Sequence, residues 1–244
     1  MESTVIPALV CALLGAGAGW LVPRLIGAVP EPETDPEEEP GEFPEKVPYR
    51  VIAGAPGLAL RCAIACAVVA GVLGATFGWT WALPWLLFLV PIGCALTIID
   101  YTTWYLPSKI VNPSYAVVAL LVVVGAVAVS DWRVVVWAVA GLLALGLYYG
   151  LMWLISPRIM AFGDVRLGGL LGLALGPLGA GVLIISVLAA GVIGALAWPA
   201  LRLLGRTWRR DGSEGLLRER VPFGPFLMVG ALVAAVAGQY IVLS

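Results

Sequence analysis

The sequence contains no histidine. This absence excludes a histidine general base and any metal site built on imidazole nitrogen. Cysteine is scarce as well: Cys11, Cys62, Cys66 and Cys94 are the only four, and all lie in apolar runs. Cys62 and Cys66 would share a helix face, but no second pair is present to complete a zinc site. We therefore expect buried thiols, and neither a metal nor another cofactor.

Charged residues are few for a chain of this length. They make up 12% of the 244 residues, whereas about 25% is usual in a soluble domain. Hydrophobic residues make up 61%, and the mean hydropathy is +1.00. Apolar runs of about 18 residues or more recur, as helices that cross a bilayer require. The sequence therefore predicts an all-α polytopic membrane protein with about eight transmembrane helices, which has the lipid bilayer and no nucleic acid as a partner.

The chain divides into three parts by composition. Residues 1–27 hold the first apolar run, which we interpret as a retained transmembrane helix because no basic stretch precedes it, as one would in a signal peptide. Residues 28–56 form a cytoplasmic loop rich in proline and acidic residues, which is expected to be solvated. Residues 57–244 form a membrane-embedded core. Its expected apolar segments are 57–77, 83–99, 113–130, 134–155, 167–176, 178–201 and 222–243.

The apolar segment 167–176 is short for a membrane crossing. It would rise about 16 Å as a helix, against about 30 Å of hydrocarbon. It therefore either belongs to a longer helix that begins near Phe162 or enters the membrane and returns. If it crosses and the N-terminus lies outside, every lysine and arginine except Arg133 falls on the cytoplasmic side. The positive-inside rule favours this topology.

Two acidic residues stand at the edges of apolar segments. Asp100 follows the run 83–99, and Asp164 stands behind Gly163 where the short apolar segment opens. An ionisable group at the edge of the hydrocarbon is costly and indicates a functional site. In the preferred topology both lie at the cytoplasmic ends of their helices, at the same depth. We therefore treat them as a candidate pair.

Two carboxyl groups held close together share a proton and titrate as a pair. One can act as a base that activates water while the other, protonated, polarises a peptide carbonyl group, as in aspartic proteases. Gly163 would let a substrate chain approach closely, because glycine has no side chain. Two other interpretations stay open at this point. The acids could be ordinary interfacial residues near Lys109 and Arg166, or they could serve an ion-coupled transporter.

The segment 160–167, Met-Ala-Phe-Gly-Asp-Val-Arg-Leu, resembles the Gly-x-Gly-Asp-Val-Lys-Leu signature of type IV prepilin peptidases, which are leader-processing aspartic proteases of the bacterial membrane. Two more segments match in family order. Asp100 is followed by Leu106 and Pro107, then by Ile110 and the segment 112–115, Asn-Pro-Ser-Tyr. The segment 221–227 reads Val-Pro-Phe-Gly-Pro-Phe-Leu after a basic stretch. The last of these is also a typical helix start, which gives it a structural role.

The resemblance implies that Asp100 and Asp164 are the catalytic pair and that Phe162 and Gly163 lie where the substrate approaches. It implies an aspartic endopeptidase that needs no cofactor. Its partner would be a prepilin or pilin-like precursor, from which the enzyme removes the leader peptide. The expected location is the bacterial plasma membrane, with the active site facing the cytoplasm.

The sequence departs from the family pattern in two places. The first glycine of the signature is Ala161 here, which would be strained if the backbone needed a positive φ angle. Many members also carry paired Cys-x-x-Cys motifs after the first helix, associated with N-methylation, whereas the acidic loop here has no cysteine. We therefore expect no methyltransferase activity. The other readings are an intramembrane protease that cuts within its substrate's helix, a carboxylate-coupled transporter and a non-catalytic scaffold.

Overall fold

The structure is a computed structural model that describes residues 2–31, 47–156, 160–204 and 222–242. Within these ranges the chain is helical and contains no strand, which confirms the all-α prediction. The elements are α1 Glu2–Trp20, α2 Val22–Ala28, α3 Tyr49–Ala53, α4 Leu58–Phe77, α5 Leu83–Thr103, α6 Ser108–Ala128, α7 Arg133–Ile155, α8 Phe162–Leu175, the 3₁₀ helix η1 Gly176–Leu178, α9 Ala180–Leu203 and α10 Gly224–Val242.

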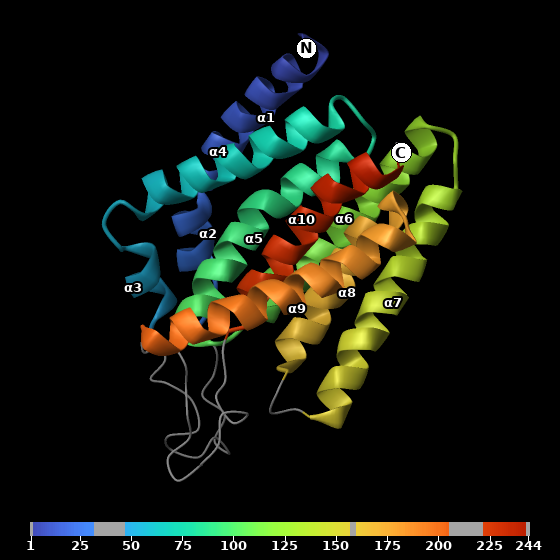
Figure 1. Cartoon of the computed structure of the whole chain (residues 1–244). Helices are drawn as coiled ribbons and strands as arrows, with labels where there is room; N and C mark the ends of the chain where they lie inside the picture. Colours follow the sequence, from blue (N-terminus) through green and yellow to red (C-terminus); the bar gives the residue numbers. More distant parts are fainter. Residues whose placement is uncertain (1, 32–46, 157–159, 205–221, 243–244) are drawn as a thin grey trace.

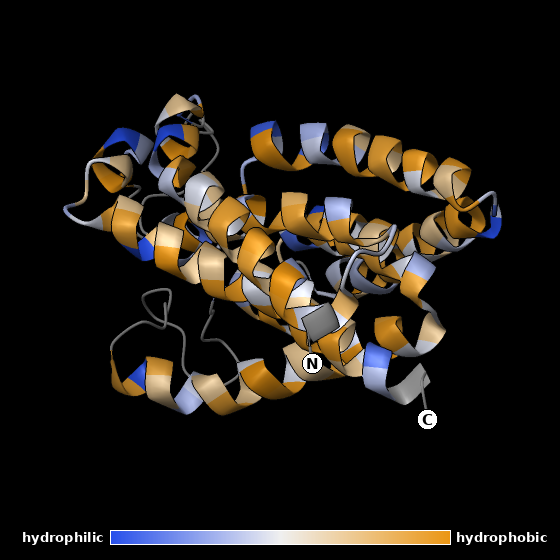
Figure 2. Cartoon of the chain, turned by 90° about the horizontal axis from the view of Figure 1, so that it is seen from above, coloured by the Kyte–Doolittle hydropathy of each residue, from blue (hydrophilic) through white to orange (hydrophobic). Residues whose placement is uncertain are grey.

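Among the described residues, six helices are long and apolar enough to cross a membrane. One span, Thr4–Ala28, combines α1 and α2, and the others are α4, α5, α6, α7 and α9. Figure 2 shows hydrophobic residues along most of the length of the helices and hydrophilic residues mainly near their ends. The chain is thus a polytopic membrane protein. The predicted total of about eight spans requires α8 and α10 to cross as well, and that number stays a prediction.

Helix α5 lies inside the bundle and is the most buried of the six candidate spans. It contacts α4, α6 and α10, and it also touches α1 and α2. Six of the other helices form close pairs, α1 with α4, α7 with α8 and α9 with α10 (Figure 1). The two helices of each pair run in opposite directions (Figure 1). The chain therefore passes back and forth along one common direction, as a polytopic membrane protein does.

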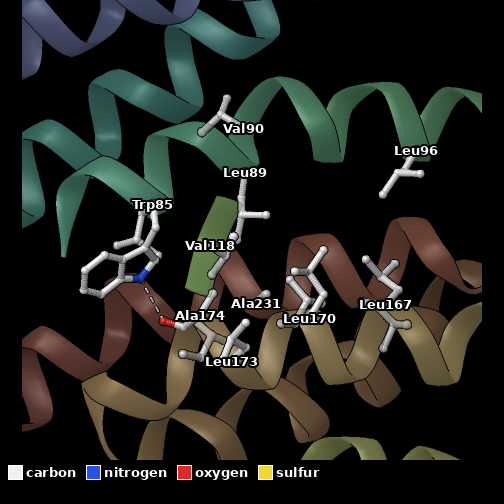
Figure 3. Packing of buried hydrophobic residues seen from close by; sticks show 14 of the residues in the cluster. Trp85, Leu89, Val90, Leu96, Val118, Leu167, Leu170, Leu173, Ala174 and Ala231 are labelled. Atoms are coloured by element: carbon white, nitrogen blue, oxygen red, sulfur yellow. Dashed lines mark hydrogen bonds between the residues drawn. The ribbon is translucent and has the colours of Figure 1, made fainter. Parts of the chain in front are cut away.

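The core between α5, α8 and α10 is apolar (Figure 3). The side chains of Leu96, Leu167 and Leu170 are buried there. Near the start of α5, the indole Nε1 of Trp85 donates a hydrogen bond of 3.0 Å to the carbonyl oxygen of Ala174, near the end of α8 (Figure 3). This bond joins the start of α5 to the end of α8, and the two helices are antiparallel. The end of α5 and the start of α8 therefore lie together at the other end of the core.

Helix α8 packs against α7 through a row of glycines. Gly168, Gly172 and Gly176 follow one another at intervals of four residues, which places them on one face of the helix. A Cβ on Gly172 would collide with the carbonyl oxygen of Gly141 in α7, and a Cβ on Gly176 would collide with that of Trp137. The two backbones therefore touch, as in other membrane helix pairs with small residues at the interface. This contact sets the position of α8.

The short apolar segment 167–176 belongs to a longer helix, in agreement with one of the two alternatives. Helix α8 begins at Phe162 and its 14 residues rise about 21 Å. In Figure 1 it leads from the end of α7 to the start of α9, at the opposite end of the bundle. The turn between η1 and α9 uses Gly179 at φ +113°, a conformation that is easy only for glycine.

The predicted end of the helix 83–99 was wrong, because α5 continues to Thr103. The reason lies in its polar residues. The hydroxyl of Thr102 donates to the carbonyl oxygen of Ile98 at 2.7 Å, and that of Thr103 donates to Ile99 at 2.8 Å. Both hydroxyl groups are satisfied within the helix, so a polar composition does not end it here. Asp100 consequently sits in the last turn of α5, at the helix end where it was expected.

The predicted start of the helix 113–130 was also wrong, because α6 begins at Ser108 and ends at Ala128. Pro107, at φ −68°, precedes the helix, and Pro113 lies inside it. A proline inside a helix removes one backbone hydrogen bond, but membrane helices tolerate this loss. The connection from α5 to α6 is therefore a short turn instead of the longer polar stretch that the sequence indicated.

The region 28–56, predicted as a loop, contains one element that the sequence did not indicate. This element is the short helix α3, which follows Pro48. The backbone N–H of Tyr49 donates a hydrogen bond of 2.7 Å to the carboxylate of Glu31. The two described ends of the region are therefore held together. The acidic segment 32–46, predicted as solvated, lies outside the described residues.

Candidate active site

Asp100 is buried, with 5% of its surface exposed, in the last turn of α5. Gly224, the first residue of α10, donates a hydrogen bond of 2.9 Å from its backbone N–H to Oδ2 of Asp100. A Cβ at this glycine would lie 2.7 Å from the same oxygen, closer than the two atoms can approach. Gly224 thus allows the carboxylate to rest against the start of α10.

Asp164 is the third residue of α8 and is 4% exposed. Its Oδ2 accepts a hydrogen bond of 3.2 Å from the backbone N–H of Ala161, which precedes the helix. Ala161 has φ −77° and ψ 151°, an extended conformation that any residue adopts. The alanine that replaces the first glycine of the signature is therefore unstrained at this position.

The two predicted site residues come together in the structure. Their carboxyl groups are close enough for the charge of Asp100 to act on Asp164. A Cβ on Gly163 would lie 2.9 Å from Cβ of Leu106, so the start of α8 also touches the segment that follows α5. The end of α5, the start of α8 and the start of α10 therefore meet at one end of the apolar core.

The hydrogen bonding of the pair leaves one oxygen of each carboxyl group available. Among the residues that the structure describes, Asp100 and Asp164 each have one hydrogen-bonded oxygen, Oδ2, and neither forms an ion pair with a lysine or arginine. Ordinary interfacial acids would be expected to pair with nearby cations such as Lys109 or Arg166. This interpretation is therefore not supported by the contacts.

Phe162, predicted to lie where the substrate approaches, is 49% exposed and outside the buried pair. Its ring centroid lies 5.3 Å from that of Trp153, and the guanidinium carbon of Arg166 lies 5.0 Å from it. The guanidinium group of Arg166 thus forms a cation–π contact with Phe162 and no ion pair with Asp164. The three side chains form a group beside the start of α8, in which Phe162 is exposed and Trp153 and Arg166 are partly buried.

Three residues near the pair were not predicted as part of the site. Gly224 was interpreted as a helix start only, although its segment was noticed as a motif. The hydroxyl of Tyr115 in α6 donates a hydrogen bond of 2.6 Å to the carbonyl oxygen of Arg166. Tyr149 in α7 is buried and close enough to Asp164 to interact with its charge. Tyr115 belongs to the segment 112–115 that forms part of the family resemblance, whereas Tyr149 carries no sequence signal because it lies within an apolar helix.

Within the described ranges, no group of three or more histidine, cysteine, aspartate or glutamate side chains is arranged to hold a metal ion. Comparison of the sequence with protein-family models, with curated proteins and with solved structures found no match. What the site can do therefore follows from its own residues.

Proposed function

We propose that this protein is a membrane aspartic endopeptidase of the prepilin-peptidase type, which removes the leader peptide from a prepilin or pilin-like precursor. The observation that carries the proposal is that two buried carboxyl groups, Asp100 and Asp164, lie on helix ends that meet at one end of the core, without a compensating cation among the described residues. The three sequence motifs converge on this pair, since Gly163 and Gly224 both lie next to it.

The pair would work by sharing one proton, because two nearby carboxylates do not ionise independently. The charged carboxylate takes a proton from water as that water attacks the scissile carbonyl carbon. The protonated carboxyl group gives its proton to the carbonyl oxygen. When the tetrahedral intermediate collapses, the carboxyl group that gained the proton passes it to the leaving nitrogen, and the C–N bond breaks. The other carboxylate takes a proton back from a hydroxyl group of the intermediate, so the pair again holds one shared proton. The unbonded oxygens of the two side chains are free for these transfers.

The site is proposed to face the cytoplasm of a bacterial cell. Arg133 begins α7, at the end of the bundle away from the carboxyl pair. The segments that carry Arg50, Lys109 and Arg166 adjoin the end that holds the pair. Lysine and arginine accumulate on the cytoplasmic side of membrane proteins. This distribution supports the predicted orientation.

The main alternative from another class is a carboxylate-coupled transporter. Such a protein needs polar groups that line a path through the membrane. The buried hydroxyl groups of Thr103, Ser114 and Ser186 each donate to a carbonyl oxygen of their own helix, at 2.8 Å in every case. They are therefore already satisfied and offer no path. This observation favours the peptidase.

The proposal is tested by co-expression with a candidate prepilin and by comparison of wild type with Asp100→Asn and Asp164→Asn. Asparagine keeps the size of the side chain but cannot share a proton. We expect both variants to insert normally and to lose leader removal. The matched control is Asp131→Asn, since Asp131 is exposed in the turn before α7, and it should cleave like wild type.

Normal cleavage by Asp100→Asn or by Asp164→Asn would refute the aspartic dyad. Sequencing of the new N-terminus separates the two protease readings. A cut at the junction of leader and apolar helix supports the proposed enzyme. A cut inside the apolar helix would instead indicate an intramembrane protease.

A further inference from the structure

A groove of about 530 Å³ lies between α4, α5, α8 and α10. Its wall is almost entirely apolar, with Leu58 and Leu73 marking the limits along α4. These two residues are 15 positions apart, so the groove follows the helix for about 22 Å. Neither the proposed chemistry nor the sequence motifs account for a groove of this length.

The groove runs along α5 in the direction of the carboxyl pair. On α5 it is lined by Leu86, Val90, Gly93 and Thr97, whose spacing of three and four residues defines one face of the helix. The next position on that face is Asp100, three residues after Thr97. The groove and the carboxyl group therefore share a face of α5.

The groove residues of α8 and α10 also lie on helix faces that run toward the carboxyl pair. On α8 the groove is lined by Leu171, and Asp164 lies seven residues, or two turns, before it on the same face. On α10 it is lined by Met228, and Gly224 lies one turn before it. Continued one to two turns beyond the last lining residue, these three helix faces reach the two carboxyl groups and the glycine bonded to Asp100.

The groove is open at the surface of the protein. Ala65 and Val229, which line it from α4 and α10, are exposed, and Cys94 is partly exposed. Helices α4 and α10 make few direct contacts with each other, so the opening lies between them. An apolar groove open toward the membrane can receive a partner from within the bilayer.

We infer that this groove holds the apolar helix of the precursor, with the scissile bond beyond the helix end, at the carboxyl pair. The inference rests on the proposed function and names where its substrate binds. A peptide in hydrocarbon must satisfy its own backbone groups and is therefore helical, whereas a bond that water attacks must lie outside the helix. The groove provides an apolar wall, and the pair lies one to two helical turns beyond its end. A lipid chain could occupy the groove, but it has no peptide bond to place at the carboxyl pair.

The binding site is tested first without cleavage, in the Asp164→Asn variant. The probe is a candidate prepilin with a single cysteine in its apolar helix, and a bismaleimide joins it to Cys94. Cys94 is suitable because it is the most exposed of the four cysteines, and Cys62→Ala and Cys66→Ala remove the two other thiols that line the groove. We expect a cross-linked product for cysteines on one face of the precursor helix, and its loss in Cys94→Ala.

A second experiment tests a substitution that fills the groove. Ala65→Trp places a large side chain in it, and Ala75→Trp is the matched control, because Ala75 is exposed on the same helix but does not line the groove. We expect Ala65→Trp to reduce cross-linking about tenfold, the size that overpacking of a contact surface commonly produces. It should also reduce cleavage of the full precursor more than cleavage of a short peptide that lacks the apolar helix. Ala75→Trp should behave like wild type in both assays.

The outcomes separate the two proposals. Cross-linking that depends on Cys94 and Ala65 supports the groove, even if wild type fails to cleave, in which case only the peptidase proposal falls. No cross-link from any position of the precursor helix, or equal loss with Ala65→Trp and Ala75→Trp, overturns the groove. Protection of Cys94 by phospholipid but not by precursor overturns it as well, and assigns the groove to lipid.

Discussion

The backbone N–H of Gly224 lies 2.9 Å from Oδ2 of Asp100, so the first residue of α10 holds the carboxylate at the end of α5. The two residues are 124 positions apart. Because Gly224 has no side chain, its backbone can approach the carboxylate directly. The same residue begins α10, whose side chains line the apolar groove. Gly224 therefore joins the candidate catalytic group to the wall along which we expect the substrate to lie.

Gly224→Ala is expected to displace the Asp100 carboxyl group, because the new Cβ would lie 2.7 Å from Oδ2. The side chain can move aside, so stability should change little. Leader removal should fall by about a hundredfold, as misplacement of a catalytic group by about 1 Å commonly causes. Thermal unfolding in detergent and cleavage rates measure the two effects. Gly181→Ala is the control, since open space surrounds Gly181. Cleavage at the wild-type rate in Gly224→Ala would contradict a positioning role.

Substitutions at Gly163 and at Ala161, two residues apart, should affect cleavage differently. Gly163→Ala brings a Cβ to 2.9 Å from Cβ of Leu106, so the start of α8 and Asp164 with it must shift. We expect cleavage to fall about tenfold or more. Ala161→Gly restores the glycine of the signature, but Ala161 already has a negative φ, so cleavage should stay within about twofold of wild type. A large gain from Ala161→Gly would show that this position does need glycine's freedom.

Gly172→Ala should weaken the packing of α7 on α8. Its Cβ would collide with the carbonyl oxygen of Gly141, a backbone atom that cannot turn aside. We expect the free energy of unfolding to fall by about 1–3 kcal/mol, the usual range for overpacking, and leader removal to fall with it. Gly146→Ala is the matched control on α7, because the nearest atom to its added Cβ is 3.9 Å away. Equal melting temperatures for the two variants would contradict the close backbone contact.

The sequence was sufficient to predict the class of fold and the two acidic residues. Asp100 and Asp164 stand out because acids are rare beside long apolar runs, and that signal is local. The helix ends were harder to predict. Thr102 and Thr103 are polar, yet each hydroxyl group donates a hydrogen bond to a carbonyl oxygen of its own helix. Composition alone does not reveal that kind of internal hydrogen bond.

Contacts between distant segments could not be predicted from one sequence. The spacing of Gly168, Gly172 and Gly176 was visible, but the partner of that face, Gly141 in α7, was not. The bond from Gly224 to Asp100 depends on how α10 packs on α5, which no periodicity in either segment specifies. The groove is likewise a property of four helices together. The two acidic residues of the proposed dyad could therefore be singled out from the sequence, whereas the contacts that place them could not.

Tyr115→Phe tests one of these placing contacts. The hydroxyl group of Tyr115 in α6 donates to the carbonyl oxygen of Arg166, two residues after Asp164, at 2.6 Å. Loss of a hydrogen bond between membrane helices costs about 0.6–1.7 kcal/mol, so the melting temperature should fall. Cleavage should fall less than in Asp164→Asn, because the dyad itself is intact. Tyr148→Phe, on the exposed side of α7, is the control and should melt like wild type. If Tyr115→Phe also melts like wild type, this bond does not hold α6 to α8, and the start of α8 must owe its position to the glycine contacts with α7 and to Leu106.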